Sequence, residues 1–539
     1  MLSTMQDAPL SIATLLRYGS TVHGGAEVVT WTDFGAQRRS YAEIGRRCAA
    51  LAHALRGLGV TGDQRVATFM WNNAEHLEAY LAVPSMGAVL HTLNIRLFPE
   101  QLVHVANRAE DHVIIVDPTL IPLLAPQLPQ LTSVKHVIVT GDTTAGLEAP
   151  EGVQVHAYEA LIADQPTEFH WPEIDERSAA MCYTSGTTGD PKGVVYSHRS
   201  IWLHSMSVCM TDGMALRQGD NALAIVPQFH AMSWGLPYAA FMVGASLLMP
   251  DRFLQPEPLV RMIAEARPNF AAAVPTIWQG ILHHLENHAD DVSSMKTVVV
   301  GGSAVPPALM HALEEQHGIT VLHAWGMTET SPLASVAHPP SSATGEEAWR
   351  YRYTQGRFPA GVEARLVDDT GAVVPSDGTS VGELEVRGPW IAGAYYGVDA
   401  PEKFDDGWLR TGDVGKITPD GFLTITDRSK DIVKSGGEWI SSVELENLVM
   451  AHPDVLEAAV IGIPDPKWDE RPLVAVVIRD GSDVTPTQLK EFMVGRVAGW
   501  QLPENWVRIA EVPKTSVGKF DKKRLRTQFY DGELCVEHV

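Results

Sequence analysis

The sequence predicts an α/β protein with two domains. Short β-branched runs at residues 65–70, 88–93, 113–116 and 137–139 alternate with helical or loop segments. This alternation is the signature of parallel sheets covered by helices. At 539 residues the chain is too long for one hydrophobic core. Its composition, 45% apolar and 20% charged, is that of a soluble globular protein.

The first strong helix signal begins at Ser40. Ser40 and Glu43 have the spacing of a capping box, and Gly59 marks a stop. An apolar stripe lies between these signals and consists of Ile44, Cys48, Leu51 and Leu55. Because these positions recur at helical spacing, we expect a helix that buries one face.

A loop rich in hydroxyl groups and glycine separates two strand-like runs at residues 181–183 and 194–196. The loop contains Thr184, Ser185, Gly186, Thr187, Thr188, Gly189 and Lys192. Backbone N–H groups and hydroxyls at such a hairpin tip can wrap an anion, and a polyphosphate suits them. It is not a Walker A loop, since Lys192 is followed by Gly193 and not by Ser or Thr. An ordinary flexible turn would have a similar composition.

Two later runs, at residues 298–300 and 320–323, read as central strands. Each ends in small or polar residues, at the place where α/β sheets usually bind ligands. Between residues 355 and 427 the sequence pattern changes to short strands separated by Gly, Asp and Pro turns, which predicts a β-barrel-like subdomain.

A domain boundary is predicted near Lys430. A strand at residues 421–426 ends at a charged segment, and a new α/β alternation starts at Val443. We therefore expect a large domain, residues 1–429, with two helix-covered sheets and the barrel-like subdomain. A small α+β domain, residues 430–539, follows a hinge.

Charge and cysteine usage exclude several classes of function. The formal net charge of −24 lacks the basic footprint of a nucleic-acid-binding protein. Four cysteines lie far apart without a C-x-x-C pair, so neither a zinc site nor a disulfide framework is indicated, and a reducing cytoplasm fits. No apolar run reaches the ~18 residues that a transmembrane helix needs.

Six motifs occur in one order along the chain and together resemble the adenylate-forming superfamily. That superfamily includes acyl-CoA synthetases, luciferases and the adenylation domains of nonribosomal peptide synthetases. The motifs are residues 183–194, 325–329, 382–388, 408–413, 427–431 and 513–519. The resemblance covers roughly residues 10 to 530, and six ordered motifs do not arise by chance.

The resemblance implies that a carboxylic acid and ATP form an acyl-adenylate. Lys519 matches the lysine that bridges the carboxylate and the α-phosphate; taken alone it would read as a solvated surface lysine. Glu329 and Thr184 match ligands of Mg²⁺, Thr328 matches a phosphate contact, and Lys192 completes the phosphate loop. A carboxylate at the start of a helix is the alternative reading of Glu329.

The remaining nucleotide contacts follow from the same resemblance. Asp413 and Arg428 resemble the pair that holds the ribose hydroxyls, although each could be half of a structural ion pair. The adenine site is matched by Gly302, Ser303, Ala304, His323, Ala324, Trp325 and Gly326. Backbone groups there would read the edge of the base, and a flat wall would pack on its face.

A second half-reaction, transfer of the acyl group to coenzyme A, is implied by the segment after the boundary. Lys430 resembles the hinge about which the C-terminal domain rotates. The implied CoA channel comprises Ser435, Gly436, Gly437, Glu438 and Trp439. Its paired glycines allow a close backbone approach. A tight Gly-Gly turn before the next helix is the alternative.

The acid substrate is predicted to be a medium- or long-chain fatty acid. His230 stands where amino-acid-activating domains carry an aspartate, so an amino-acid substrate would leave its ammonium unpaired. Trp234 resembles a tryptophan that gates the acyl tunnel, although it could be simple core. Val274 and Gly326 would line the pocket.

Other assignments remain open at this point. They are a ligase for methylthiopropionate or a cinnamate-like acid, a fatty acyl-AMP ligase that makes no thioester, and a non-catalytic nucleotide sensor. The expected partners are the acid, ATP and CoA, with a homodimer compatible with the resemblance.

Overall fold

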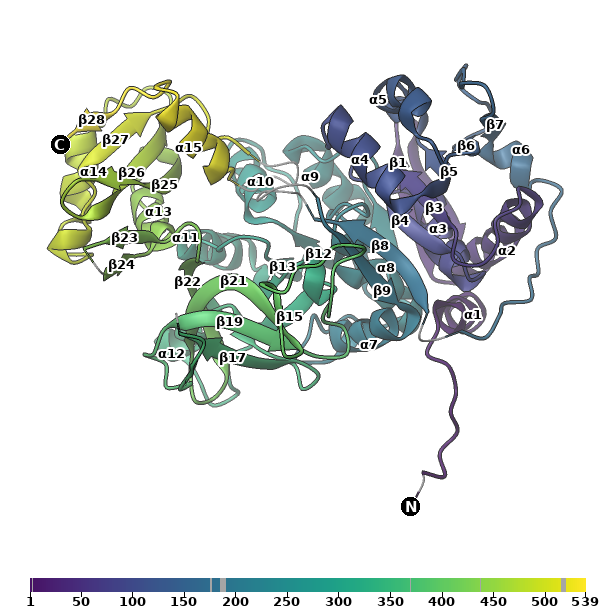
Figure 1. Ribbon diagram of the computed structural model, residues 1–539, viewed down its shortest axis with the longest axis horizontal. Helices are drawn as coiled ribbons and strands as arrows, with labels where there is room; N and C mark the ends of the chain where they lie inside the picture. The colour runs from purple at the N-terminus through teal and green to yellow at the C-terminus, as the bar shows by residue number, and fades with distance from the viewer. Residues whose placement is uncertain (2, 175–176, 185–190, 369, 437, 515–519) are drawn as a thin grey trace.

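The computed structural model describes residues 1, 3–174, 177–184, 191–368, 370–436, 438–514 and 520–539. Figure 1 shows a large body built from the N-terminal and central parts of the chain, with a lobe of C-terminal elements beside it. The mixed α/β class and the large and small parts predicted from the sequence are confirmed.

One sheet of the body has seven strands in the order β7-β6-β5-β3-β4-β8-β9. All neighbours are parallel except β8 and β9. The strands are β3 Arg65–Phe69, β4 Val89–Thr92, β5 Asp111–Val116, β6 His136–Val139, β7 Gln154–Ala157, β8 Ser178–Tyr183 and β9 Gly193–Ser197. The four runs read as strands in the first half of the sequence therefore lie side by side.

Helices cover both faces of this sheet. On one face α2 (Tyr41–Gly57) and α3 (Ala74–Ser85) share a core with β3, β4 and β5, and on the other face α4 (Pro99–Ala109) does so. The Ser40 side chain caps α2 by accepting from the backbone N–H of Glu43, and the predicted apolar stripe of α2 is fully buried. Further helices here are α1 Ile12–Val22, α5 Ile121–Leu124 and α6 Tyr158–Ile162.

A second sheet joins the remaining strands of the body into one hydrogen-bonded path, β18-β17-β19-β21-β22-β16-β15-β14-β13-β12-β10-β11-β1-β2, with β20 beside β21. The strands of this sheet that lie between residues 27 and 326 are β1 Glu27–Thr32, β2 Gly35–Ser40, β10 Asn221–Leu223, β11 Ser246–Met249, β12 Phe270–Ala273, β13 Thr297–Val300 and β14 Thr320–Gly326. The associated helices are α7 His198–Cys209, α8 Leu236–Val243, α9 Pro256–Ala266, α10 Pro275–Asn287, α11 Pro307–His311 and α12 Gly345–Tyr353.

The β-rich region predicted between residues 355 and 427 is continuous with this sheet. The N-terminal half of β14 pairs in parallel with β13, and its C-terminal half pairs antiparallel with β15. The path continues through β15 Leu333–Val336, β16 Gly356–Arg357, β17 Glu363–Val367, β18 Val373–Val374, β19 Gly382–Arg387, β20 Phe404–Asp405, β21 Trp408–Ile417 and β22 Phe422–Arg428. Strand β14 therefore connects the helix-covered sheet to the barrel-like region.

The C-terminal lobe is built on a six-stranded sheet. It contains β23 Val433–Ser435, β24 Glu438–Ile440, β25 Val455–Asp465, β26 Asp469–Ile478, β27 Asn505–Arg508 and β28 Glu537–His538, with α13 Ser442–Met450, α14 Pro486–Met493 and α15 Lys522–Tyr530. Strand β22 extends past the predicted end at residue 426, because its pairing with β21 continues as far as Arg428. Lys430 lies between β22 and β23; a domain boundary there stays a prediction.

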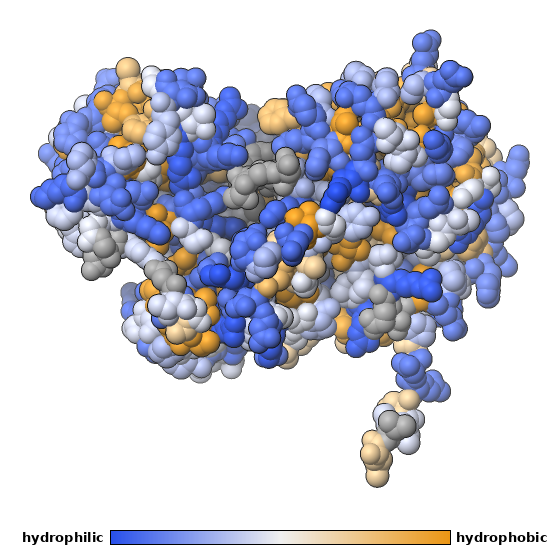
Figure 2. Space-filling view, in the orientation of Figure 1, coloured by the Kyte–Doolittle hydropathy of each residue, from blue (hydrophilic) through white to orange (hydrophobic). Residues whose placement is uncertain are grey.

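The surface is mostly hydrophilic in the view of Figure 2, and it is hollowed between the C-terminal lobe and the body. Among the described residues, no helix combines the length and the apolar character that crossing a bilayer requires.

Three buried histidines make the fold sensitive to acid. Burial lowers the pKa of His76 and of His323 to about 4 and that of His204 to about 3, against an ordinary value of 6.5. The unfolded chain therefore binds more protons than the folded one below pH 6.5, and stability falls as the pH falls through this window. His204 Nε2 accepts from the Leu333 N–H at 3.0 Å, an interaction that a second imidazole proton would destroy.

We expect His204→Gln, which keeps an acceptor for Leu333, to flatten this acid dependence. Between pH 6.5 and 4.5 the free energy of unfolding should fall less steeply than in the unmodified protein, by about 1.4 kcal/mol per pH unit. Urea unfolding at several pH values measures both slopes. Parallel curves would show that His204 does not titrate in this way.

Candidate active site

The base of the predicted phosphate loop is an antiparallel hairpin, as the sequence predicted. Tyr183 at the end of β8 pairs with Gly193 at the start of β9. The Thr184 N–H donates to the Lys192 carbonyl at 3.0 Å, and the Lys192 N–H donates to Thr184 Oγ1 at 3.1 Å. These two bonds bring the ends of the loop together. Its tip, Ser185, Gly186, Thr187 and Thr188, lies outside the described residues.

Thr328 and Glu329 lie in a short 3₁₀ turn after β14 and are linked to this hairpin. Thr328 and Glu329 are 8% and 5% exposed. Tyr196 on β9 donates to the Thr328 carbonyl at 2.8 Å, and Tyr395 donates to Glu329 Oε1 at 2.6 Å. The Lys192 ammonium lies 5.0 Å from the centroid of the Tyr395 ring. The predicted metal ligand and the loop lysine thus meet at Tyr395.

Asp413 and Arg428 are direct partners across β21 and β22. The Arg428 Nε lies 2.6 Å from Asp413 Oδ1, and the Trp325 indole N–H donates to Asp413 Oδ2 at 2.9 Å. Asp413 is 2% exposed, whereas the Arg428 side chain is 41% exposed. The predicted pair therefore consists of a buried carboxylate and a partly exposed cation.

The predicted adenine segments end neighbouring strands. Gly302, Ser303 and Ala304 follow β13, while His323, Ala324, Trp325 and Gly326 complete β14. His323 is 2% exposed, and its Nδ1 has no hydrogen-bond partner among the described residues. A Cβ on Gly326 would lie 1.8 Å from the Pro332 carbonyl oxygen, so this position admits only glycine.

Part of the predicted acyl pocket lies near the ends of the same strands. A Cβ on Gly301 would lie 2.5 Å from the Ala324 carbonyl and 3.6 Å from Trp234 Cη2, so the Trp234 indole lies near Gly301, directly after β13. Trp234 is 7% exposed, His230 is half-buried, and Val274 is the N-cap of α10.

Trp234 belongs to a turn with an uncommon backbone conformation. The φ angles of Ala231, Met232, Ser233 and Trp234 are all between 43° and 55°, and Gly235 continues at 75°. L-residues in the left-handed region cost roughly 1–2 kcal/mol each. Such strain is typical of functional sites that fix one side chain in place.

The residues predicted for the hinge and the CoA channel follow Arg428 in the chain. Burial is the main cause of the lowered pKa of Lys430, and its carbonyl accepts from Arg526 at 3.2 Å. Ser435 accepts from Arg471 at 3.2 Å, and the Gly436 N–H donates to the Trp468 carbonyl at 2.7 Å.

Trp439 lies on β24 and is half-buried, and the backbone of Glu438 belongs to the same strand. The described contacts of Ser435 and Gly436 are thus within the C-terminal sheet. Gly437 and Lys519 lie outside the described residues.

Strand β14 and the turn after it bring the predicted groups together. Ala324 approaches Gly301 beside Trp234, Trp325 holds Asp413, and Glu329 reaches Tyr395. Sequence reasoning did not identify Tyr395, Tyr196 or Gly301. A buried tyrosine hydroxyl needs a partner, but a single sequence does not say which tyrosine reaches Glu329.

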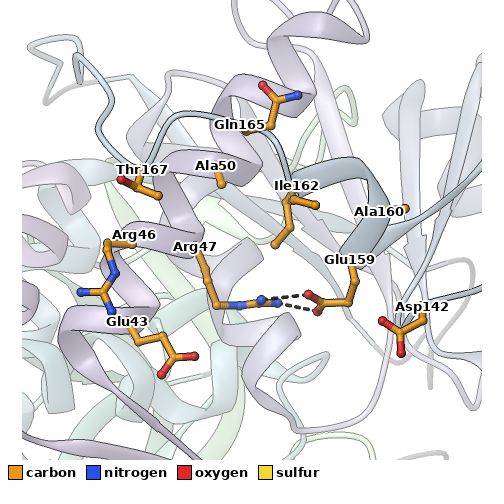
Figure 3. A pocket seen from close by; sticks show the side chains of 11 residues that line it. Glu43, Arg46, Arg47, Ala50, Asp142, Glu159, Ala160, Ile162, Gln165 and Thr167 are labelled. Atoms are coloured by element: carbon orange, nitrogen blue, oxygen red, sulfur yellow. Dashed lines mark hydrogen bonds and ion pairs between the residues drawn. The ribbon is translucent and has the colours of Figure 1, made fainter.

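A cavity of about 510 Å³ lies elsewhere, between α2, α6 and the loop after α6. Figure 3 shows it lined by charged side chains, with Arg47 and Glu159 joined by two hydrogen bonds at 2.9 and 2.6 Å. Its lining contains none of the predicted site residues. Because Arg47 also pairs with the buried Glu78 at 2.6 Å, this charged cluster fixes α2 against α3.

Comparison with known proteins identifies the family. Residues 18–396 match the family described as AMP-binding enzyme, and residues 444–519 match its C-terminal domain. The chain is 43% identical over 537 residues to a 3-methylmercaptopropionyl-CoA ligase of Ruegeria lacuscaerulensis, covering 98% of this chain and 99% of the relative.

Two further relatives carry other acids in their names. The chain is 42% identical to a medium-chain-fatty-acid–CoA ligase of Ectopseudomonas oleovorans, covering 98% of both chains. It is 43% identical to a long-chain-fatty-acid–CoA ligase of Thermus thermophilus, covering 98% of this chain and 97% of the relative.

The fold is shared with an anthranilate CoA ligase solved in complex with anthranoyl-AMP. The TM-score is 0.88 at 25% sequence identity, and the match covers 98% of this chain and all of the other. The sequence matches, which span both parts of the chain, and this common fold agree: the chain belongs to the AMP-binding enzyme family.

Proposed function

We propose that the protein is an ATP-dependent ligase that joins a medium- or long-chain fatty acid to coenzyme A through an acyl-adenylate. The observation that carries this proposal is the arrangement around β14. On β14 and in the turn after it, Trp325 donates to Asp413, Glu329 accepts from Tyr395, and Ala324 lies against Gly301. The full-length similarity to acid–CoA ligases supports the same reaction.

Adenylation is the first half-reaction. A carboxylate oxygen of the acid attacks the α-phosphorus of ATP, the bond to the β-phosphate breaks, and pyrophosphate leaves. Lys519 would bridge the carboxylate and the α-phosphate, while Lys192, Thr328 and the loop from Thr184 to Thr188 would hold the phosphates. Cations and N–H groups fixed in this way stabilise charge that develops in the transition state.

The donor set fits a hard divalent cation such as Mg²⁺. Glu329 is buried, and Tyr395 donates to one of its two carboxylate oxygens, Oε1. Glu329 and Thr184 would bind the cation together with phosphate oxygens and water, the coordination that Mg²⁺ favours. When bound, the metal would neutralise charge on the departing pyrophosphate.

The nucleoside would be held by Asp413, by Arg428 and by the ends of strands β13 and β14. Asp413 accepts from Arg428 and Trp325, and each carboxylate oxygen has a second lone pair for a ribose hydroxyl. Adenine would lie between residues 302–304 and 323–326.

Thioester formation is the second half-reaction. The sulfur of CoA attacks the acyl carbonyl, the bond to the phosphate oxygen breaks, AMP leaves, and the thiol proton passes to solvent. We propose that residues 430–539 rotate about Lys430 as a domain separate from residues 1–429. The rotation would exchange Lys519 for the channel of residues 435–439.

The acid itself is inferred from the pocket. His230, Trp234, Val274 and Gly326 offer no acidic partner for an amino group. An alkyl chain suits the apolar or small residues Trp234, Val274 and Gly326. A ligase for 3-methylmercaptopropionate is the second candidate, because the relative from Ruegeria lacuscaerulensis is named for that acid. We propose a cytoplasmic location and a homodimer as secondary expectations.

A substrate panel separates the two candidates. We expect kcat/KM for thioester formation to be lower with propionate and 3-methylmercaptopropionate than with octanoate. Palmitate tests how long a chain the pocket accepts, and cinnamate tests whether it accepts an aromatic acid. A preference for 3-methylmercaptopropionate over octanoate would replace the fatty-acid assignment by the second candidate.

A further inference from the structure

Tyr395 contacts two residues that carry opposite charges in the candidate site. Its hydroxyl donates to Glu329 Oε1 at 2.6 Å, and its ring centroid lies 5.0 Å from the Lys192 ammonium. In the part of the chain that the structure describes, Lys192 and Glu329 each contact Tyr395 and form no ion pair with each other. Tyr395 is 7% exposed, so water screens these contacts little.

The segment that carries Tyr395 is tied at both ends to the elements that carry those charges. At one end the Ala392 N–H donates to the Glu329 carbonyl at 2.7 Å. At the other end the Tyr396 N–H donates to the Gly193 carbonyl at 2.8 Å, next to Lys192. The segment therefore spans the distance between the turn after β14 and the base of the phosphate-loop hairpin.

Further contacts fix the position of the Tyr395 ring. Phe404 packs edge-on against it with ring centroids 5.2 Å apart. Ser331 donates to the Trp390 carbonyl at 2.7 Å, and Arg108 donates to the Gly397 carbonyl. Both the ring and the hydroxyl of Tyr395 are thus placed by the surrounding structure.

We infer that Tyr395 is a positioning residue that keeps Lys192 and Glu329 apart and so keeps both available to the metal–ATP complex. This inference rests on the proposed function. A lysine and a glutamate in a buried site attract each other, and a direct pair would occupy the ammonium and the carboxylate that the nucleotide needs. The aromatic face holds the cation and the hydroxyl holds the carboxylate, yet neither contact neutralises the charge.

The Tyr395 hydroxyl is the donor in its hydrogen bond to Glu329 Oε1. Burial, followed by the charge of Glu329 and the hydrogen bond to it, raises the pKa of Tyr395 well above its ordinary value of 10.0. The hydrogen bond engages one lone pair of Glu329 Oε1 and leaves the other lone pairs of the carboxylate for a cation.

Binding of Mn²⁺ tests this role without catalysis. Mn²⁺ is titrated by electron paramagnetic resonance into the full-length protein in the presence of α,β-methylene-ATP. We expect Tyr395→Phe, which keeps the ring and loses the hydroxyl, to weaken Mn²⁺ binding roughly 10-fold. The KM for the acid should not change. Tyr395→Leu, which loses both contacts, should weaken the binding of Mn²⁺ and of the nucleotide.

Tyr396→Phe is the matched control. It removes the hydroxyl group from the adjacent residue, which lines a cavity of about 380 Å³ together with Tyr395. The control should bind Mn²⁺ as the unmodified protein does. Equal losses in Tyr395→Phe and Tyr396→Phe would overturn the inference, because they would indicate a general disturbance of the segment.

A double-mutant cycle separates positioning from general stability. If Tyr395 acts through Glu329, Tyr395→Phe should not weaken Mn²⁺ binding further in a Glu329→Gln background. Additive effects, or unchanged binding in Tyr395→Phe, would overturn the positioning role alone. Absence of Mn²⁺-dependent nucleotide binding in the unmodified protein would overturn the proposed function and this inference with it.

Discussion

Replacing Lys519 by alanine should strongly slow acyl-adenylate formation and leave thioester formation from preformed acyl-adenylate intact. Loss of one charged group that stabilises the transition state lowers the rate of a chemical step by roughly 10²–10³-fold. The loss should be seen in ATP–pyrophosphate exchange, which reports the first half-reaction alone. The second half-reaction, measured with synthetic acyl-adenylate and CoA, should keep its rate because Lys519 has no part in it.

Described residues that flank Lys519 in the chain form several contacts. Asp521 caps α15 by accepting from the Arg524 N–H, and its own N–H donates to the Pro513 carbonyl at 2.7 Å. The Lys522 Nζ on α15 lies 2.7 Å from Glu446 Oε1. The hydrogen bond between Asp521 and Pro513 joins the described residues that flank Lys519 in the chain.

Lys523→Ala is the matched control for this prediction. Lys523 is exposed and lies on the same short basic stretch, so it shares the charge of Lys519 without its predicted contact. We expect its exchange rate to equal that of the unmodified protein. Equal rates of exchange in Lys519→Ala and the unmodified protein would remove Lys519 from the mechanism.

Asp413→Ala should cause the second-largest loss, in the use of ATP. Each hydrogen bond to a charged group contributes about 1.5–3 kcal/mol, so losing two ribose contacts should lower kcat/KM for ATP roughly 10²-fold or more. The change also removes the carboxylate partner of Arg428. Trp325→Phe, which removes only the indole donor to Asp413, should have a smaller effect in the same direction.

Deoxynucleotides make this test specific to the ribose. The unmodified protein should prefer ATP to 3′-deoxy-ATP, and Asp413→Ala should lose most of that preference because the group that reads the hydroxyl is gone. If the variant kept the full preference, Asp413 would be a structural partner of Arg428 and not a ligand of the ribose.

Much of the scaffold could be predicted because the signals are local. The cap at Ser40, the alternation of β-branched runs and the hairpin around the phosphate loop depend on neighbours in the chain. The order of the motifs predicted that Trp325–Glu329 and Asp413 belong to one site. Their contact through the Trp325 indole was not predictable, because it depends on how β14 and β21 are placed relative to each other across β15, β16 and β22.

The features that could not be predicted depend on contacts distant in sequence. The switch of β14 from parallel to antiparallel pairing makes the barrel-like region continuous with the central sheet. The left-handed turn at residues 231–235 contains Ala, Met, Ser and Trp, which do not favour that conformation by themselves. Tyr395 lies 66 residues from Glu329 along the chain.

The most direct test of the proposed reaction is the stoichiometry of products from octanoate, ATP and CoA. Acyl thioester, AMP and pyrophosphate are quantified in one reaction with the unmodified protein. We predict one of each per acid consumed, with no thioester when CoA is omitted. Pyrophosphate and acyl-adenylate without thioester, even at saturating CoA, would contradict the ligase assignment and place the protein among enzymes that stop at the acyl-adenylate.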